Sequence, residues 1–352
     1  MSYFLAIDAG GTKTQCLLAD ETHVLARAST GTVKLMRVGE TEATARLQAM
    51  LADLSTAAGL SLTHITRTCI GLAGLSSPSV RAWAERVVGV LVAGELLLCG
   101  DEEIALDAAF GAGPGILVVA GTGSNAIGRA STGEIVSAGG WGPVLGDEGS
   151  GMWIGLEAIR AVLAARDRRL SRKQNSSDSI GDSHTLIDEI ARHWRLNSLG
   201  ELVAYANRRG DAHSAAPDFA SLAPLVAHCA EQADALACDV LFRAGNELAV
   251  LVAQVAHKMV SQKKVLLAAQ SSMHVDSTAP AVPSTPEIDV AFTGSVLAQI
   301  AAVRKAMTAC LTVLLPSAQV RGSAVDPLDG ALWRARLSYS LPCKCDGESI
   351  TV

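Results

Sequence analysis

One pattern occurs twice in this sequence and limits the folds that the chain can adopt: three short strand-like runs in succession, with glycines between the first two. The first copy has its apolar or alternating runs at 3–7, 14–19 and 24–28, and the second has them at 116–120, 125–129 and 134–138. Short runs separated by glycine and polar turns are typical of a strand meander. The repetition predicts two copies of one fold that face each other, with a ligand bound between them.

The position of the first glycines argues against a dinucleotide-binding fold. In such a fold the glycine turn opens a helix. Here the turn leads into the apolar run 15–19 and then directly into the polar turn 20–23, so a second strand is expected instead.

Helices are expected to alternate with further strands. Apolar residues recur with helical spacing over 47–54 and 80–91, and Ser77 and Pro78 are a typical N-cap and first residue for the second of these helices. Strands are predicted at 68–70, 96–99 and 290–292. Strands that alternate with helices predict a layered α/β fold.

The order of these elements predicts two domains. The N-terminal domain covers residues 1–115 and regains a closing helix from about 326–340, the C-terminal domain covers 116–325 with helical insertions, and a flexible tail follows at 341–352. Within the second domain, 296–311 is expected to be one helix, and the polar stretches 168–183 and 271–286 are expected to be surface loops.

Composition excludes several classes of protein. Hydrophobic residues make up 49% of the 352 residues, which is incompatible with a largely disordered chain, and the net charge of −6 offers no basic face for nucleic acid. No apolar run approaches the roughly 20 residues of a membrane span, and the start of the chain lacks the features of a signal peptide. A cytoplasmic protein that binds neither nucleic acid nor membrane is expected. The scattered cysteines, including Cys343 and Cys345, are then expected to be free thiols.

The first glycine turn has the composition of a phosphate-binding loop. After the strand ending near Asp8 come Gly10, Gly11, Thr12, Lys13 and Thr14. Glycines let a phosphate oxygen approach consecutive backbone N–H groups, and the threonine hydroxyls can add hydrogen bonds. Asp8 is expected to hold Mg²⁺, directly or through water, because this cation prefers oxygen ligands. The plainer alternative is a glycine-rich hairpin with a capping aspartate.

The second glycine turn offers the same chemistry in the second copy of the pattern. It consists of Gly121, Thr122, Gly123 and Ser124. A third turn, at Gly294 and Ser295, follows a strand and can pack a nucleoside on main chain. Two phosphate loops at corresponding places predict that a polyphosphate is bound between them.

Together these turns resemble the phosphate-1, phosphate-2 and adenosine motifs of the actin/heat-shock chaperone/hexokinase superfamily. The run 139–151 (GGWGPVLGDEGSG) is similar to the signature of N-acetylglucosamine and glucosamine kinases and their BadF/BadG/BcrA/BcrD-type relatives. The resemblance extends from Ile7 to about Ala335 and is weakest over 166–285. It implies two ribonuclease-H-like (actin-like ATPase) domains facing an interdomain cleft, ATP and Mg²⁺ as cofactors, and a homodimer.

Asp101 is the candidate general base. It follows the strand 96–99, and phosphorylation of a sugar needs a carboxylate within hydrogen-bond reach of the attacking hydroxyl. The resemblance places the catalytic aspartate of the family at this position. The alternative is that Asp101 only caps the helix predicted over 104–110.

The resemblance also implies contacts to the sugar. These would come from Gly74, Gly140, Trp141 and Asp147, together with Asp101. The alternative is that Trp141 belongs to the core and that Asp147 caps a helix beginning near residue 150.

One position departs from the pattern of the family. Related kinases usually carry an asparagine that hydrogen-bonds the sugar after the third strand, where this chain has Lys34 with Arg37 nearby. A cation facing the ligand would suit neutral or acidic sugars better than protonated glucosamine. Solvated cations on a surface loop are the alternative.

The predicted function is ATP-dependent phosphorylation of an amino sugar, with N-acetylglucosamine and its 6-phosphate as the first choice and glucosamine or another hexose as the alternative. A second hypothesis is an ATPase that activates a dehydratase or reductase partner. Such relatives bind a [4Fe–4S] cluster between two subunits through cysteines, and no other cysteine in the sequence stands out as a second cluster ligand beside Cys99. A sugar sensor without catalysis is a third, against which the presence of both Asp8 and Asp101 argues.

Overall fold

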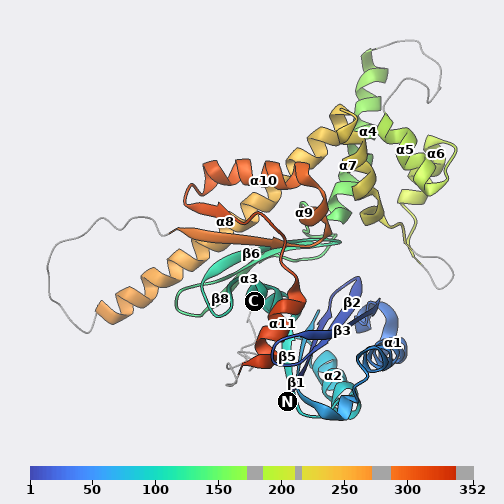
Figure 1. Ribbon diagram of the computed structural model, residues 1–352. Helices are drawn as coiled ribbons and strands as arrows, with labels where there is room; N and C mark the ends of the chain where they lie inside the picture. Colours follow the sequence, from blue (N-terminus) through green and yellow to red (C-terminus); the bar gives the residue numbers. More distant parts are fainter. Residues whose placement is uncertain (173–184, 211–215, 272–286, 338–352) are drawn as a thin grey trace. The chain divides into compact units, whose positions relative to one another are not determined.

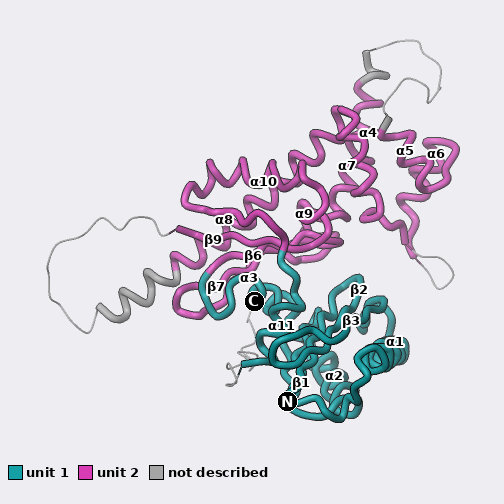
Figure 2. Tube along the Cα trace, in the orientation of Figure 1, with its two compact units in different colours: residues 1–114, 325–352 teal, residues 115–324 magenta. Residues whose placement is uncertain are grey.

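The computed structural model describes residues 1–172, 185–210, 216–271 and 287–337, and its elements are labelled in Figure 1. They divide into two units, of which unit 1 holds residues 1–114 and the described residues from 325 onward, and unit 2 holds residues 115–324 (Figure 2). Each unit contains a five-stranded sheet. The predicted tail at 341–352, with Cys343 and Cys345, lies outside the described residues.

The sheet of unit 1 has the order β3-β2-β1-β4-β5. Its strands are β1 (Tyr3–Ala9), β2 (Lys13–Ala19), β3 (Val24–Gly31), β4 (Ile65–Leu72) and β5 (Glu95–Gly100). The first three are antiparallel neighbours, whereas β1, β4 and β5 run parallel. The predicted meander is therefore present, and the parallel strands place their carboxyl ends at one edge of the sheet.

Two layers of helices cover this sheet because successive residues of β1 point to opposite faces. Leu5 and Ile7 pack in one core with α1 (Leu35–Ala58) and α2 (Pro78–Leu91). The short 3₁₀ helix η1 (Leu62–His64) lies between these two helices in the sequence. Phe4 and Ala6 pack in the other with α3 (Asp101–Phe110) and α11 (Pro327–Arg336). A β carbon on Gly330 of α11 would lie 1.8 Å from the carbonyl oxygen of Ile104, so glycine is required where α11 crosses α3.

Helix α1 begins earlier than its apolar spacing predicts. It starts at Leu35, directly after Lys34, and bends at Gly39, whose φ of 76° is not helical. Helix α2 begins at Pro78 behind Ser77, as expected. The residues around Lys34 thus form the junction of a strand and a helix.

The sheet of unit 2 repeats the topology of unit 1, with the order β8-β7-β6-β9-β10. Its strands are β6 (Gly115–Ala120), β7 (Ser124–Arg129), β8 (Ile135–Gly139), β9 (Ile288–Thr293) and β10 (Ala318–Val320). Again three antiparallel strands are followed by two parallel ones. The prediction of an α/β chain with two copies of one fold is confirmed.

Among the described residues, unit 2 has more helices than unit 1, and its α8 is longer than any helix of unit 1. The helices of unit 2 are α4 (Gly151–Arg172), α5 (Thr185–Trp194), α6 (Leu199–Ala206), the 3₁₀ helix η2 (Phe219–Leu222), α7 (Ala223–Glu231), α8 (Ala235–Ser271), α9 (Ser295–Gln299) and α10 (Ala301–Leu314). Helices α8 and α10 lie side by side (Figure 1).

Two predictions for this region are corrected. The single helix expected over 296–311 is interrupted at Ile300, and residues 168–172, expected in a surface loop, continue α4. The rest of the expected loop 168–183, and 272–286 of the other, lie outside the described residues.

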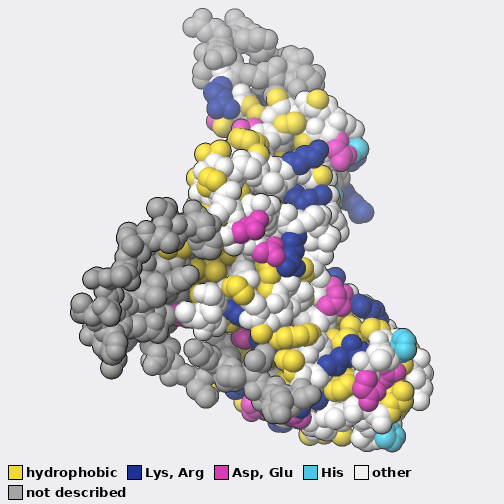
Figure 3. Space-filling view, turned by 60° about the vertical axis from the view of Figure 1, so that its left-hand side comes forward, with side chains coloured by type: hydrophobic (Ala, Val, Ile, Leu, Met, Phe, Trp, Pro, Cys, Tyr) yellow, Lys and Arg dark blue, Asp and Glu magenta, His cyan; other side chains and the backbone are white. Residues whose placement is uncertain are grey.

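Lysine and arginine side chains are scattered among acidic ones over the face drawn in Figure 3, so that face carries no large patch of one charge.

Among the helices that the structure describes, none combines the length and the apolar character that a membrane crossing requires.

Candidate active site

Two carboxylates lie at the carboxyl edge of the sheet of unit 1. Asp8 is near the end of β1, and Asp101 is the first residue of α3, directly after β5. Strand β4 lies between them, with Gly71 opposite Asp8 and Leu72 opposite Gly100. A β carbon on Gly71 would lie 3.2 Å from the α carbon of Asp101, so the glycine lets α3 begin close to the sheet.

Asp101 influences the ionisation of Asp8. Burial, followed by the charges of Asp101 and Asp326, raises the pKa of Asp8 to about 7, and Lys13 opposes this rise. Burial also raises the pKa of Asp101, against the effects of backbone N–H groups and of Lys34. The pKa of each carboxyl group is therefore shifted in the direction that a nearby cation would reverse.

The reading of Asp101 as a helix cap is wrong. The N-cap of α3 is Gly100, and Asp101 is the first residue within the helix. The partial positive charge at the start of a helix still stabilises an aspartate at this position, but the Asp101 side chain is not the cap of α3.

The glycine turn beside Asp8 is open and is held from one side. Nothing lies within 4 Å of a β carbon built on Gly11, so space remains above its backbone. The Thr32 hydroxyl donates to the carbonyl of Gly10 (2.9 Å), and the Arg37 guanidinium donates to that of Gly11 (2.8 Å). Thr14 is fully buried and its hydroxyl accepts a hydrogen bond from the N–H of Val33 (3.3 Å). Thr14 therefore connects the end of the glycine turn to the segment that follows β3.

In unit 2, the second and third predicted turns lie against each other. A β carbon on Gly121 would be 3.9 Å from the Ser295 hydroxyl, and one on Gly294 would be 2.3 Å from the carbonyl of Ala120. Gly294 has a φ of 94°, which favours glycine. Strands β6 and β9 are parallel neighbours, so the turns that follow them meet at one sheet edge.

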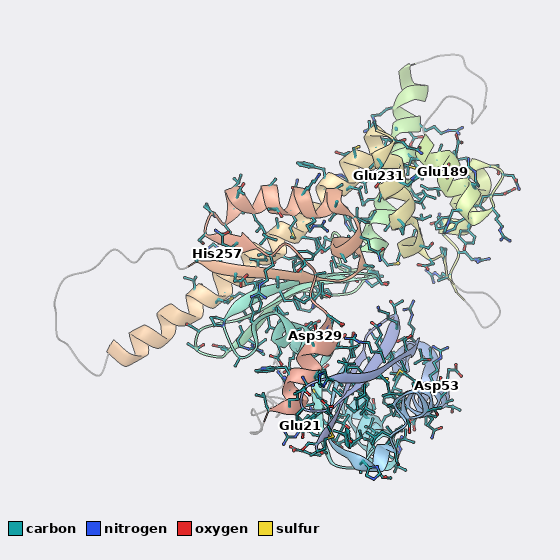
Figure 4. The ribbon with its side chains drawn as sticks, viewed as in Figure 1. Glu21, Asp53, Glu189, Glu231, His257 and Asp329 are labelled. Carbon is teal, nitrogen blue, oxygen red and sulfur yellow. The ribbon has the colours of Figure 1, made fainter. Side chains whose placement is uncertain are left out.

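A pocket of about 280 Å³ opens beside these turns. Gly121, Thr122 and Ser295 line one side of it, and residues of α7 such as Ala227 and Glu231 line the other. Figure 4 labels Glu231 at the end of α7. The α7 wall was not predicted, because its alanines look like ordinary helix residues and it lies where the resemblance is weakest.

The profile of one protein family matches residues 5–331, nearly the whole chain: that of the BadF/BadG/BcrA/BcrD ATPases. The chain belongs to this family.

Two relatives of this BadF/BadG/BcrA/BcrD-type ATPase are named sugar kinases. The N-acetylmuramic acid/N-acetylglucosamine kinase of Clostridium acetobutylicum is 31% identical over 270 residues, covering 76% of this chain and 84% of the relative. The N-acetyl-D-glucosamine kinase of Dictyostelium discoideum is 26% identical over 274 residues, covering 74% and 81%. The prediction that the chain is a sugar kinase is confirmed by these relatives.

Solved structures confirm the fold. A protein from Chromobacterium violaceum superposes with a TM-score of 0.66 at 24% identity, covering 94% of this chain and 98% of its own. A ROK family glucokinase from Streptomyces griseus, solved with glucose and AMPPNP, superposes with a TM-score of 0.52 at 15% identity, covering 95% and 98%. The two α/β units of this BadF/BadG/BcrA/BcrD-type ATPase are thus of the actin-like kind.

The signature segment 139–151 of this ATPase divides into an exposed part and a buried part. Trp141 is 75% exposed, so the reading of this residue as core is wrong. Asp147 is only 7% exposed and packs against the second glycine turn, since a β carbon on Gly123 would lie 2.8 Å from its carboxylate. The hydroxyl of Ser150 accepts from the N–H of Trp153 (3.2 Å), so Ser150 caps α4 in place of Asp147. Gly140 has a φ of 74°, which lets the chain turn here.

Gly74 and Lys34, also predicted to contact the sugar, lie in unit 1. Gly74 has a φ of 82° in the turn after β4, and no atom lies within 4 Å of a β carbon built on it. Lys34 is the N-cap residue of α1.

Cys99 lies beside a second thiol. Its sulfur is 4.0 Å from that of Cys69, and both residues are free cysteines and fully buried. Arg334 of α11 donates to the Cys99 sulfur (2.8 Å) and pairs with Asp107 and Glu103 of α3. Among the described residues, no group of three or more histidine, cysteine or acidic side chains is arranged to hold a metal ion.

Proposed function

We propose that this protein transfers the γ-phosphoryl group of ATP to the 6-hydroxyl of an amino sugar, with N-acetylglucosamine as the first candidate. The position of Asp101 carries the proposal: a partly buried carboxylate at the same sheet edge as the open glycine turn beside Asp8. The names of the two relatives support the choice of an amino sugar.

In this proposal, each predicted residue has a distinct role. Asp101 accepts the proton of the sugar hydroxyl as its oxygen bonds to the γ-phosphorus and ADP leaves. Backbone N–H groups of the two glycine turns bind the phosphates, at Gly10, Gly11, Thr12, Lys13, Gly121, Thr122, Gly123 and Ser124. The nucleoside occupies the pocket beside Gly294 and Ser295. Gly74, Lys34, Gly140, Trp141 and Asp147 contribute to sugar binding.

The residues near Asp8 fit Mg²⁺. Asp8 supplies oxygen donors, and its raised pKa, caused first by burial and then by Asp101 and Asp326, marks a site where a cation would relieve repulsion. Mg²⁺ binds through one or two carboxylates together with the phosphates of a substrate and keeps several waters, so Asp8 can serve as its protein ligand. When bound, Mg²⁺ would neutralise charge on the transferring phosphoryl group.

A coupled assay of ADP release tests the proposal. The substrates would be N-acetylglucosamine, glucosamine, N-acetylmannosamine, N-acetylmuramic acid and glucose, and the phosphorylated position would be assigned by NMR. We expect N-acetylated amino sugars to be phosphorylated at O6 with the highest kcat/KM. ADP release that no sugar stimulates would contradict the proposal and favour an ATPase that serves a partner protein.

Homodimer formation and a cytoplasmic location stay predictions. Size-exclusion chromatography with light scattering would test the first, and cell fractionation would test the second.

A further inference from the structure

A buried arginine of α11 contacts residues on both sides of Asp101 in the sequence. Arg334 is 8% exposed. Its guanidinium donates to the Cys99 sulfur (2.8 Å), two residues before Asp101, and to the Glu103 carboxylate (3.3 Å), two residues after it. It also pairs with Asp107, which lies one turn further along α3. A single side chain therefore connects the end of β5 to the first two turns of α3.

Glu103 extends this connection to the backbone next to Asp101. One oxygen of its carboxylate accepts from Arg334 (3.3 Å), and the other accepts from the N–H of Gly100 (3.4 Å). Gly100 is the N-cap residue of α3 and has no side chain with which to cap the helix. A glutamate at the third helical position that accepts from the N-cap N–H stabilises the first turn of a helix. Arg334 and Glu103 thus act together on the point where α3 begins.

Close backbone packing sets how near this helix start lies to its neighbours. A β carbon on Gly71 of β4 would lie 3.2 Å from the α carbon of Asp101, and one on Gly330 of α11 would lie 1.8 Å from the carbonyl oxygen of Ile104. Arg334 follows Gly330 by one turn of the same helix. Apolar packing is not directional, whereas hydrogen bonds are. The contacts of Arg334 therefore add a definite orientation to a helix start that packing only brings close.

Orientation matters here because a general base must lie within hydrogen-bond reach of the proton that it accepts. A displacement of about 1 Å can lower a rate about 10²-fold. Among the described residues, the side-chain partners of Arg334 do not include Asp101, so the arginine would act on it through the backbone. Burying an ion pair adds little net stability, because the loss of hydration offsets the attraction. A role in orientation explains why charges are buried at this place.

We propose that Arg334 is a positioning residue that fixes the start of α3 and thereby keeps Asp101 within reach of the hydroxyl that it deprotonates. This inference rests on the proposed kinase function, in which Asp101 is the base.

The test is a double-mutant cycle on the kcat of sugar-dependent ADP release, with the most active of the five sugars named above. Arg334→Lys keeps a positive charge for Asp107, but an ammonium group cannot replace the planar fork that contacts three partners. We expect kcat to fall about 10–100-fold, with less than about a twofold change in the KM for ATP or sugar. In the Asp101→Asn background, Arg334→Lys should lower kcat less than about twofold, because no base remains to be positioned.

Two further variants separate positioning from a loss of stability. Leu54→Ala removes a fully buried side chain of α1, in the core on the other face of the sheet, so it should destabilise unit 1 without disturbing the start of α3. It should keep the wild-type kcat at a temperature where circular dichroism shows every variant to be folded. Glu103→Ala removes a partly exposed side chain and should lower kcat about 3–10-fold, again only when Asp101 is present.

Four results would count against these expectations. Equal fold losses from Arg334→Lys with and without Asp101→Asn would overturn the inference, since the arginine would then act independently of the base. Near-normal kcat in both Arg334→Lys and Glu103→Ala would overturn it as well, and so would an equally large loss of kcat in Leu54→Ala. Each of these leaves the kinase proposal intact. Wild type whose ADP release no sugar stimulates would contradict the proposed function itself, and the inference with it.

Discussion

The two glycine turns occupy corresponding places in two copies of one fold, but they are built differently. In unit 1 the turn lies among charges, with Asp101 and Lys13 both acting on Asp8, and side chains hold its carbonyls. In unit 2 the carbonyls of Gly121 and Thr122 instead accept backbone N–H groups from the start of α4 (2.8 and 3.3 Å). The same topology therefore carries a glycine turn held by side chains in one unit and one held by the backbone of a helix start in the other.

The largest effect expected from this difference concerns catalysis. Asp101→Asn should lower kcat by about 10³-fold, because a general base typically contributes 10²–10⁴-fold. Nucleotide affinity should change little, because Asp101 is not among the residues proposed to bind the nucleotide. Sugar-dependent ADP release would measure the first quantity and isothermal titration with ATP the second.

Asp53→Asn is the matched control, since Asp53 is exposed on α1 (Figure 4). It should alter neither quantity. If Asp101→Asn kept near-normal turnover, Asp101 would not be the base and the chemistry would have to be sought elsewhere in unit 1.

The second effect concerns how the charged edge of unit 1 is supported. Arg334 is 8% exposed and pairs with Asp107 and Glu103 on α3, the helix that begins with Asp101. Arg334→Met would remove the ion-pair partner of the buried Asp107, so the free energy of unfolding should fall by about 3–5 kcal/mol. Urea denaturation would measure this loss.

A surface pair provides the contrast. Arg27 pairs with Asp326 at 3.2 Å, and both side chains are substantially exposed. Arg27→Met should therefore lower the free energy of unfolding by less than about 1 kcal/mol. Equal losses in the two variants would mean that the buried network adds nothing beyond a surface ion pair.

The third effect is a pH dependence of stability. The pKa of Asp8 is raised to about 7, first by burial, so its neutral form is favoured in the folded protein. Stability from this group is complete below its unfolded pKa of 3.8 and is lost as pH rises through about 7. Without Mg²⁺ and nucleotide, Asp8→Asn should be the more stable protein by about 2–3 kcal/mol at high pH and should lose that advantage at low pH.

Thermal unfolding of both proteins between about pH 5 and about pH 9 would check this. Asp53→Asn should follow the wild-type curve. Parallel curves for wild type and Asp8→Asn would show that Asp8 is ionised as easily in the folded as in the unfolded chain.

Much of this arrangement could be predicted from local patterns. The strand runs and the glycines between them located both turns, and the strand before Asp101 placed that carboxylate at a strand end. Each of these inferences needs only neighbouring residues, because side-chain alternation and turn chemistry are local properties.

What could not be predicted depends on contacts between distant segments. The approach of Cys69 to Cys99, whose sulfurs lie 4.0 Å apart, follows from the order of the strands, which places β4 beside β5 and which periodicity does not specify. Gly100 rather than Asp101 caps α3, a difference of one residue that backbone geometry decides.

The smallest effect tests the other side of the comparison, the pocket of unit 2. Ala227 of α7 lines this pocket of about 280 Å³, so Ala227→Phe should fill part of it and raise the KM for ATP about tenfold, with little change in the KM for the sugar. Ala309→Phe, at an exposed position of α10, controls for the added aromatic ring. If both variants kept the wild-type KM for ATP, the nucleoside would bind outside this pocket. The turn at Gly294 and Ser295 would then need a role other than the adenosine binding that its resemblance implies.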